Sequence, residues 1–202
     1  STRSTDIYMD AIYYALNPWW EGKAIETGIS RDAYLGKIST YLTRKQIEVF
    51  IGSRRTGKTT LLKQFIKTLL EKAVSEKEIL YLALDHPVLS SVPISEHVRN
   101  MRKLFMLDRD RKLYLFLDEV QESPQWEVEL KALYDLETLK IFCTGSTSSL
   151  LTRQEGKLTG RQIVNTLFTL SFREYIQFKG GAPSLSEDYK YEQLAEDYLS
   201  IG

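Results

Sequence analysis

Short apolar runs alternate along the chain with longer stretches in which apolar residues recur at helical spacing. The runs predict buried strands, because a short strand that is covered on both faces is apolar throughout. They lie at residues 47–51, 79–84, 113–117 and 139–143, and a fifth strand is predicted at 166–170. Strands that alternate with helices are typical of a parallel sheet with helices on both faces. The pattern therefore predicts an α/β fold with a parallel five-stranded sheet.

The stretches between the runs predict amphipathic helices. Tyr34, Ile38, Tyr41 and Leu42 follow helical spacing, so we expect a helix that is capped by Ser30 and ends near Leu42. Further helices are predicted at residues 58–72, 94–105 and 126–136, and from about residue 171 onward. Three tryptophans, Trp19, Trp20 and Trp126, allow either nucleobase stacking or core packing, and we favour packing.

The composition limits the partners that we expect. The 202 residues include 27 basic and 27 acidic side chains, so the net charge does not indicate nucleic-acid binding, although local basic patches leave it open. Cys143 is the only cysteine, which excludes an intrachain disulfide and favours the reducing cytoplasm. No apolar run approaches the roughly 20 residues of a membrane-spanning helix, and no signal peptide is recognisable. We therefore expect a cytoplasmic protein without a membrane partner.

One motif carries a specific chemistry. Residues 52–59 (Gly-Ser-Arg-Arg-Thr-Gly-Lys-Thr) match the phosphate-binding pattern G-x-x-x-x-G-K-[ST] between a predicted strand and a predicted helix. Glycines let backbone amides approach phosphate oxygens, and the helix start adds its positive dipole end. Lys58 is expected to reach the β- and γ-phosphates and Thr59 to bind Mg²⁺. The alternative is a glycine-rich turn with a chance lysine. We predict an ATP or ADP site formed by Gly52, Ser53, Arg54, Arg55, Thr56, Gly57, Lys58, Thr59 and Thr60.

Two adjacent carboxylates follow the third apolar run. A buried parallel strand delivers Asp118 and Glu119 to the carboxyl edge of the sheet, where ligands bind in such folds. There Asp118 would hold Mg²⁺ with Thr59, and Glu119 would deprotonate a water directed at the γ-phosphate. A solvated strand end is the alternative for an Asp-Glu pair taken alone. Downstream of a phosphate loop, the pair predicts a catalytic role for Glu119 beside Lys58.

The fourth apolar run leads into Thr144, Gly145 and Ser146. A polar side chain at this strand end would lie between the two carboxylates and the γ-phosphate. We therefore predict that Thr144, or else Ser146, positions the attacking water, whereas the alternative is a turn followed by a helix cap. Gln121 is expected either to hold the turn after the acidic strand or to contact that water.

Other branches of phosphate-loop proteins fit less well. The chain has no guanine-reading Asn/Thr-Lys-x-Asp element, which argues against a GTPase. Residues 158–162 look like an ABC-transporter signature, but in transporters that signature precedes the acidic strand, and here it follows it. Small-molecule kinases usually lack the Asp-Glu pair and stay a weaker alternative.

Taken together, these residues resemble prokaryotic, often archaeal, AAA-type ATPases that are related to STAND and origin-recognition ATPases. The resemblance covers most of residues 15–178. Its segments are residues 17–20, 52–62, 81–85, 115–121, 126, 144–146, 158–161 and 170–175. Ser53 departs from it, since proline is common at this position, but proline is not needed to bind phosphate.

The resemblance implies an AAA-like sheet with strand order 5-1-4-3-2 and a C-terminal effector domain. Arg161 matches the family's Gly-Arg motif, which implies that it contacts the γ-phosphate in cis or acts as a finger toward a neighbouring subunit of a homo-oligomer. A surface arginine after a glycine turn is the alternative. Adenine contacts are expected between residues 29 and 45.

These expectations divide the chain into three parts. Residues 1–45 form an N-terminal segment and helix that lead into the nucleotide site, residues 46–178 form the ATPase core, and residues 179–202 begin a truncated C-terminal region. The predicted function is Mg²⁺-dependent ATP hydrolysis that changes the conformation of an attached domain or protein partner. Two alternatives remain, a nucleotide-gated switch with little turnover and a nucleic-acid-binding module with a regulatory ATP site.

Overall fold

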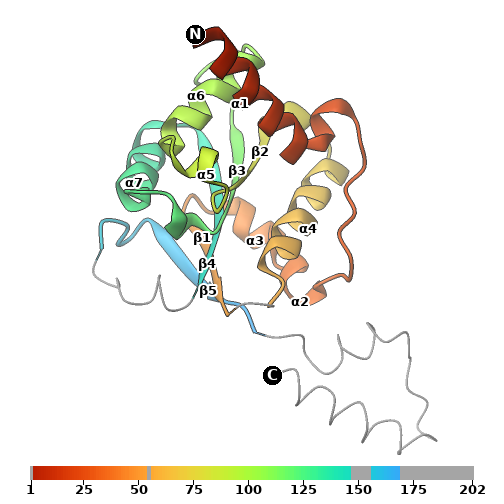
Figure 1. Ribbon diagram of the computed structural model, residues 1–202. Coiled ribbons are helices and arrows are strands. Elements are labelled where there is room, and N and C mark those ends of the chain that lie inside the picture. The colour runs from red at the N-terminus through yellow and green to blue at the C-terminus, as the bar shows by residue number, and fades with distance from the viewer. Residues whose placement is uncertain (1, 54–55, 147–155, 169–202) are drawn as a thin grey trace, which may run out of the picture.

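Five parallel strands form the centre of the computed structural model, which describes residues 2–53, 56–146 and 156–168 (Figure 1). The sheet order is β2-β3-β4-β1-β5. Read from its other edge, this is the predicted order 5-1-4-3-2, which is therefore confirmed. The strands are β1 (Ile47–Gly52), β2 (Ile79–Ala83), β3 (Leu113–Asp118), β4 (Leu139–Ser146) and β5 (Gln162–Thr166). All pairings are parallel, so the carboxyl ends of the strands meet at one edge.

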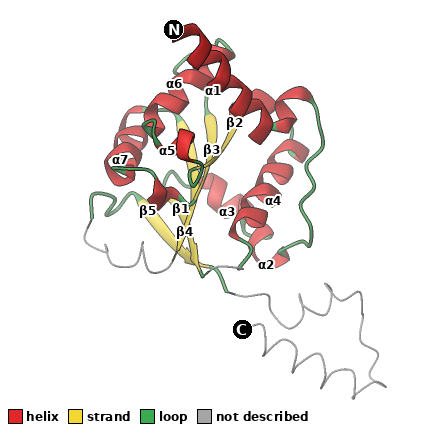
Figure 2. Cartoon of the chain, in the orientation of Figure 1, coloured by secondary structure: helices red, strands yellow, loops and turns green. Residues whose placement is uncertain are grey.

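Helices cover both faces of this sheet (Figure 2). In the view of Figure 1, α4 (Lys58–Glu71) lies on one side, and α6 (Ile94–Leu104) and α7 (Trp126–Leu136) lie on the other. The remaining helices are α1 (Thr2–Leu16), α2 (Asp32–Leu35), α3 (Ile38–Thr43) and α5 (Pro87–Ser90), with 3-10 turns at Pro18–Glu21, Glu76–Glu78 and Val120–Glu122. Within the described ranges, no helix is long and apolar enough to cross a membrane.

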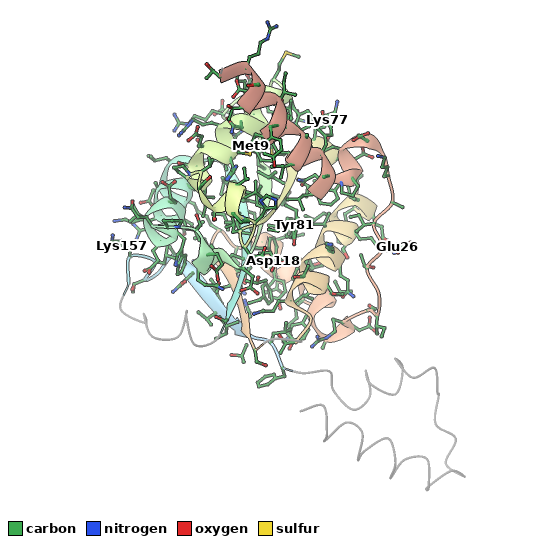
Figure 3. The ribbon with its side chains drawn as sticks, viewed as in Figure 1. Met9, Glu26, Lys77, Tyr81, Asp118 and Lys157 are labelled. Carbon is green, nitrogen blue, oxygen red and sulfur yellow. The ribbon has the colours of Figure 1, made fainter. Side chains whose placement is uncertain are left out.

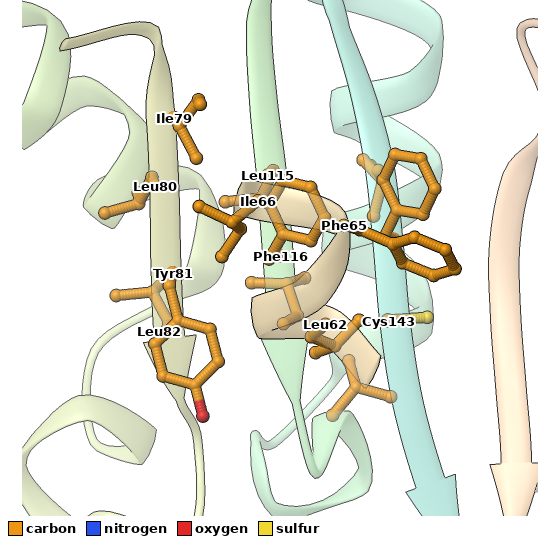
Figure 4. Close-up of a cluster of buried hydrophobic side chains, with 14 of the residues drawn as sticks. Leu62, Phe65, Ile66, Ile79, Leu80, Tyr81, Leu82, Leu115, Phe116 and Cys143 are labelled. Atoms are coloured by element: carbon orange, nitrogen blue, oxygen red, sulfur yellow. The ribbon is translucent and has the colours of Figure 1, made fainter. Parts of the chain in front are cut away.

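An aromatic cluster joins α4 to the central strands (Figure 4). Phe65 of α4 packs against Phe50 of β1 and Phe142 of β4, with ring centroids 5.4 Å apart in each pair. Phe116 of β3 stacks on Phe142 at 4.9 Å. All four side chains are fully buried, so the strands that end at the site are held by one rigid core.

The N-terminal segment closes one edge of the sheet. The Asn17 side chain accepts from the Tyr81 amide at 2.7 Å and donates to the Tyr81 carbonyl at 3.1 Å, so it pairs with the outer strand β2. The indole N–H groups of Trp19 and Trp20 both donate to the Ile79 carbonyl, at 3.2 and 2.8 Å. Both tryptophans are buried, which confirms the packing interpretation for them. These contacts satisfy backbone groups that an open sheet edge would leave exposed.

Two predicted elements are wrong in detail. The fifth strand lies at Gln162–Thr166 rather than at residues 166–170, because an edge strand is half exposed and its alternating polar residues hid it. The single helix expected after Ser30 is two short helices, α2 and α3, separated by a turn at Gly36. Helix α1 was not predicted, and the helix expected from about residue 171 lies outside the described residues.

Candidate active site

The phosphate loop connects β1 to α4, as the motif predicted. Gly57 precedes the helix with φ of 78°, a left-handed conformation that glycine adopts without strain. Gly52 has no room for a side chain, because a Cβ there would lie 2.6 Å from the Thr56 hydroxyl and 3.0 Å from the Leu167 carbonyl oxygen. The Thr56 hydroxyl donates to the Ser53 carbonyl at 2.8 Å and closes the turn. Backbone conformation thus accounts for Gly57 and packing for Gly52, and the first turn of α4 can present its amides to an anion.

Lys58 and Glu119 meet across the edge of the sheet. Their ammonium and carboxylate groups lie 3.3 Å apart, and the Lys58 ammonium also donates to the Gly52 carbonyl at 3.0 Å. The Lys58 side chain is buried, whereas that of Glu119 is 28% exposed. Gln121 donates to the second Glu119 oxygen at 2.6 Å. The contact that the sequence interpretation required between the loop lysine and the acidic pair is therefore present.

Three hydrogen bonds converge on Asp118, beside the Lys58–Glu119 ion pair. Its buried carboxylate accepts from Thr59 at 2.5 Å, from Thr144 at 2.6 Å and from Tyr81 at 2.7 Å. Thr144 also accepts from the Glu119 amide at 3.1 Å, so its hydroxyl links the two acidic residues. The three donors come from α4, β4 and β2 and orient one carboxylate at the strand end. Figure 3 labels two members of this group, Tyr81 and Asp118.

Glu119 itself has an unusual backbone. Its φ is 52°, in the left-handed region that non-glycine residues seldom occupy. The conformation ends β3 sharply and begins the 3-10 turn at Val120–Glu122, which contains Gln121. Such strain persists where the surrounding structure fixes it, and it is frequent at functional sites. Here it directs the Glu119 carboxylate toward Lys58.

Tyr81 was missed by the sequence interpretation. Burial and the neighbouring negative charge of Asp118 raise the pKa of Tyr81, so its hydroxyl stays protonated and donates to Asp118. Tyr81 lies in an apolar strand, and although residues 81–85 belong to the resemblance, no role was assigned to its side chain. Its role depends on the pairing of β2 with β3, in which Ala83 lies opposite Asp118. That register is a property of the folded sheet.

The residues predicted to hold Mg²⁺ have suitable chemistry. Thr59 and Asp118 offer a hydroxyl and a carboxylate oxygen, and this cation prefers oxygen ligands. These two oxygens lie within hydrogen-bond distance of each other, and the Thr59 side chain faces solvent at the end of the loop. The donor set therefore fits the ion. Thr60 lies beside it in the first turn of α4, whereas Arg54 and Arg55 lie outside the described residues.

The structure contradicts a cis contact between Arg161 and the γ-phosphate. Arg161 immediately precedes β5, and Gln162 pairs with Ile47 at the start of β1. This is the amino edge of the sheet, roughly 20 Å along the strand from the phosphate loop. There the Arg161 guanidinium forms an ion pair with Asp135, with Nε to Oδ1 at 2.9 Å. A role toward a neighbouring subunit stays a prediction.

The parallel sheet, the phosphate loop and the acidic strand end define an α/β P-loop NTPase. Residues 44–176 match the family described as AAA domain, and since the match spans well over half of the chain, the chain belongs to this family. It is an AAA-family ATPase domain, of a kind that binds nucleotide. The resemblance to AAA ATPases inferred from the motifs is confirmed at this level.

Curated relatives are longer than this chain. An uncharacterized protein of Methanocaldococcus jannaschii is 29% identical over 166 residues, which is 81% of this chain and 33% of that protein. An uncharacterized protein of Haemophilus influenzae is also 29% identical, over 175 residues, which is 86% of this chain and 43% of the relative. The chain thus spans less than half of the length of either relative.

Solved structures show the same fold. The Aeropyrum pernix Orc1 protein, determined in complex with DNA, superposes with a TM-score of 0.56 at 14% identity and covers 92% of this chain and 53% of its own. Hsp104, determined with ATPγS and FITC casein, gives a TM-score of 0.57 at 14% identity, with 82% and 32% covered. At such low identity, these likenesses show the architecture alone.

Proposed function

We propose that this domain hydrolyses ATP in an Mg²⁺-dependent reaction and transmits its nucleotide state to an attached domain or partner. One observation carries the proposal: the loop lysine lies 3.3 Å from Glu119, while Thr59 lies 2.5 Å from Asp118, at the same carboxyl edge of the sheet. A positive group for phosphate, an oxygen pair for a cation and a carboxylate for water are thereby brought within reach of one triphosphate.

Each residue has a separate task in this proposal. The loop amides and Lys58 bind the phosphates, and Thr59 and Asp118 would hold Mg²⁺, which would supply positive charge against the developing negative charge of the phosphates. Glu119 accepts a proton from water while the water oxygen bonds to the γ-phosphorus. The bond from that phosphorus to the bridging oxygen breaks, and ADP keeps the electron pair. Thr144 holds the Glu119 backbone and the Asp118 carboxylate in register during this step.

The contact between Lys58 and Glu119 suggests how binding prepares the base. Phosphate oxygens would compete with the Glu119 carboxylate for the Lys58 ammonium, because both are anions within reach of one cation. Once Lys58 turns to phosphate, Glu119 keeps its hydrogen bond from Gln121 and is released to bind water. Substrate binding and activation of the base would then be a single event.

Two variants test the assignment. Lys58→Ala should abolish ATP binding, whereas Glu119→Gln should bind ATP and release little phosphate, because an amide cannot accept the proton. Binding is followed by the rise in unfolding temperature with ATP, since a ligand at 100 times its Kd adds about 2.7 kcal/mol. Glu122→Gln, at an exposed carboxylate three residues further on, is the matched control. Normal turnover in Glu119→Gln would exclude the assigned base.

A switch with little turnover is the second candidate. It is favoured by the two contacts, from Lys58 and Gln121, that engage both oxygens of the Glu119 carboxylate. Phosphate release in a single turnover, compared with the steady state, separates the candidates: a fast first turnover followed by slow ADP release indicates a switch. Both relatives are longer than this chain, which supports the proposal that an attached region responds to the nucleotide state. Homo-oligomerisation and a cytoplasmic location remain predictions.

A further inference from the structure

A buried arginine from the N-terminal segment joins the phosphate loop to the end of β5. Arg31 is 3% exposed and lies at the start of α2. Its guanidinium donates through Nη1 to the Thr56 carbonyl at 2.7 Å and through Nη2 to the Phe168 carbonyl at 3.0 Å. The Arg31 amide donates to the Gln64 side chain of α4 at 3.0 Å, which fixes the arginine over the loop.

The first of these contacts orients a phosphate-binding amide. A trans peptide is planar, and its carbonyl and N–H groups point in opposite directions. Since the Thr56 carbonyl points to Arg31, the N–H of Gly57 in the same peptide points to the opposite side of the loop. The guanidinium also lies close behind this peptide, because a Cβ on Gly57 would be 3.3 Å from Nη1. Arg31 therefore supports the loop from behind.

The second contact holds the chain where it leaves the sheet. Leu167 follows β5 and donates its amide to the Ile51 carbonyl at 2.7 Å. The Phe168 carbonyl accepts from Arg31, while its amide lies 3.4 Å from the Tyr34 hydroxyl. The Phe168 side chain is 68% exposed. A single guanidinium thus holds the phosphate loop and the exit from β5 together, and any shift of one changes its bond to the other.

We propose that Arg31 is a positioning residue that sets the Thr56–Gly57 peptide for ATP phosphate binding and carries the resulting loop movement to the chain at Phe168. The inference rests on the proposed function, since it names the route by which nucleotide state leaves the site. Arginine suits this task because its planar guanidinium donates to two carbonyls at once, whereas a lysine ammonium keeps the charge but loses that geometry.

Affinity for nucleotide gives the first test. Arg31→Lys should weaken binding of both ATP and ADP about tenfold, because an ammonium cannot reproduce the planar pair of donors and one of the two buried carbonyls loses its hydrogen bond. Arg111→Gln, which removes an exposed arginine paired with Glu78, is the control and should bind as the unchanged protein does. Unchanged affinity in Arg31→Lys would refute the loop role.

A reporter at the exit gives the second test. Phe168→Cys places an exposed thiol for an environment-sensitive dye, while the buried Cys143 is protected from labelling. ATP should change the dye signal when Arg31 is present. At saturating ATP, the change should be lost in Arg31→Lys, although the site is occupied. A purely structural role of Arg31 would lower stability and leave this signal intact, so a retained signal overturns the coupling.

If Arg31→Lys does not fold, hydrogen exchange on the unsubstituted protein tests the same coupling between the loop and Phe168. ATP should slow exchange at the Gly57 amide and alter it at Phe168 together, and a change confined to the loop contradicts the coupling. These readouts use binding rather than hydrolysis. A chain that binds ATP without turnover would refute the proposed activity while the same titrations still decide on Arg31. A chain that binds no nucleotide overturns both.

Discussion

The ion pair between Lys140 and Glu48 lies near the amino edge of the sheet, at the end opposite to the site, and its removal should be costly. Lys140 of β4 is buried, and its ammonium donates to Glu48 of β1 at 2.9 Å, to the Arg44 carbonyl at 2.9 Å and to the Gln46 carbonyl at 2.5 Å. Lys140→Met keeps the side-chain length and removes all three donors. The Glu48 carboxylate, with no exposed surface, would keep its two contacts from Arg44 but lose its buried cation.

Breaking a buried pair on one side costs about 3–5 kcal/mol. Arg44, whose side chain is 28% exposed, already neutralises part of the Glu48 charge, so we expect the lower end of that range. This is a large part of the 5–15 kcal/mol that stabilises a typical domain. Urea unfolding of Lys140→Met should show a lower midpoint with an unchanged m-value.

A double variant separates the charge from the packing. Glu48→Gln in the Lys140→Met background removes the unpaired buried carboxylate, so it should recover part of the lost free energy of unfolding. The double variant would be no better than Lys140→Met if the loss came from packing alone. A loss below about 1 kcal/mol in Lys140→Met would refute the argument, because such a value is typical of exposed pairs.

Two further predictions concern single side chains. Tyr81→Phe removes one of three donors to Asp118 and should lower the free energy of unfolding by about 1.5–3 kcal/mol in urea, with Tyr114→Phe as the control. His97 contacts the Tyr13 hydroxyl and the Leu89 carbonyl, and burial lowers its pKa although the Leu89 contact opposes this. The unfolded chain therefore binds more protons just below pH 6.5, and stability should fall as the pH drops through this range, by at most about 1.4 kcal/mol per pH unit. Unfolding curves between pH 7.5 and 5.5 measure this slope, and an equal slope in His97→Gln would contradict the assignment.

The phosphate loop, four of the strands and the acidic pair are all predictable because their signals are local. A buried parallel strand appears in the sequence as an apolar run, and the loop from Gly52 to Thr59 is contiguous in the chain. The same reasoning failed at β5, where half exposure replaces the apolar run by alternation. It also failed after Ser30, where the helical spacing was right but Gly36 interrupts the helix.

The sequence by itself therefore determined the class of fold and which phosphate-loop and acidic residues stand at the ends of β1 and β3. Only the tertiary structure decided which distant side chains join them, because contacts across a sheet depend on strand order and register. Tyr81 contacts Asp118 through the pairing of two neighbouring strands, and Arg31 reaches the loop and Phe168 across segments far apart in the chain. Arg161 shows the converse: its motif suggested the γ-phosphate, but a parallel strand places its first residues at the edge opposite to its last.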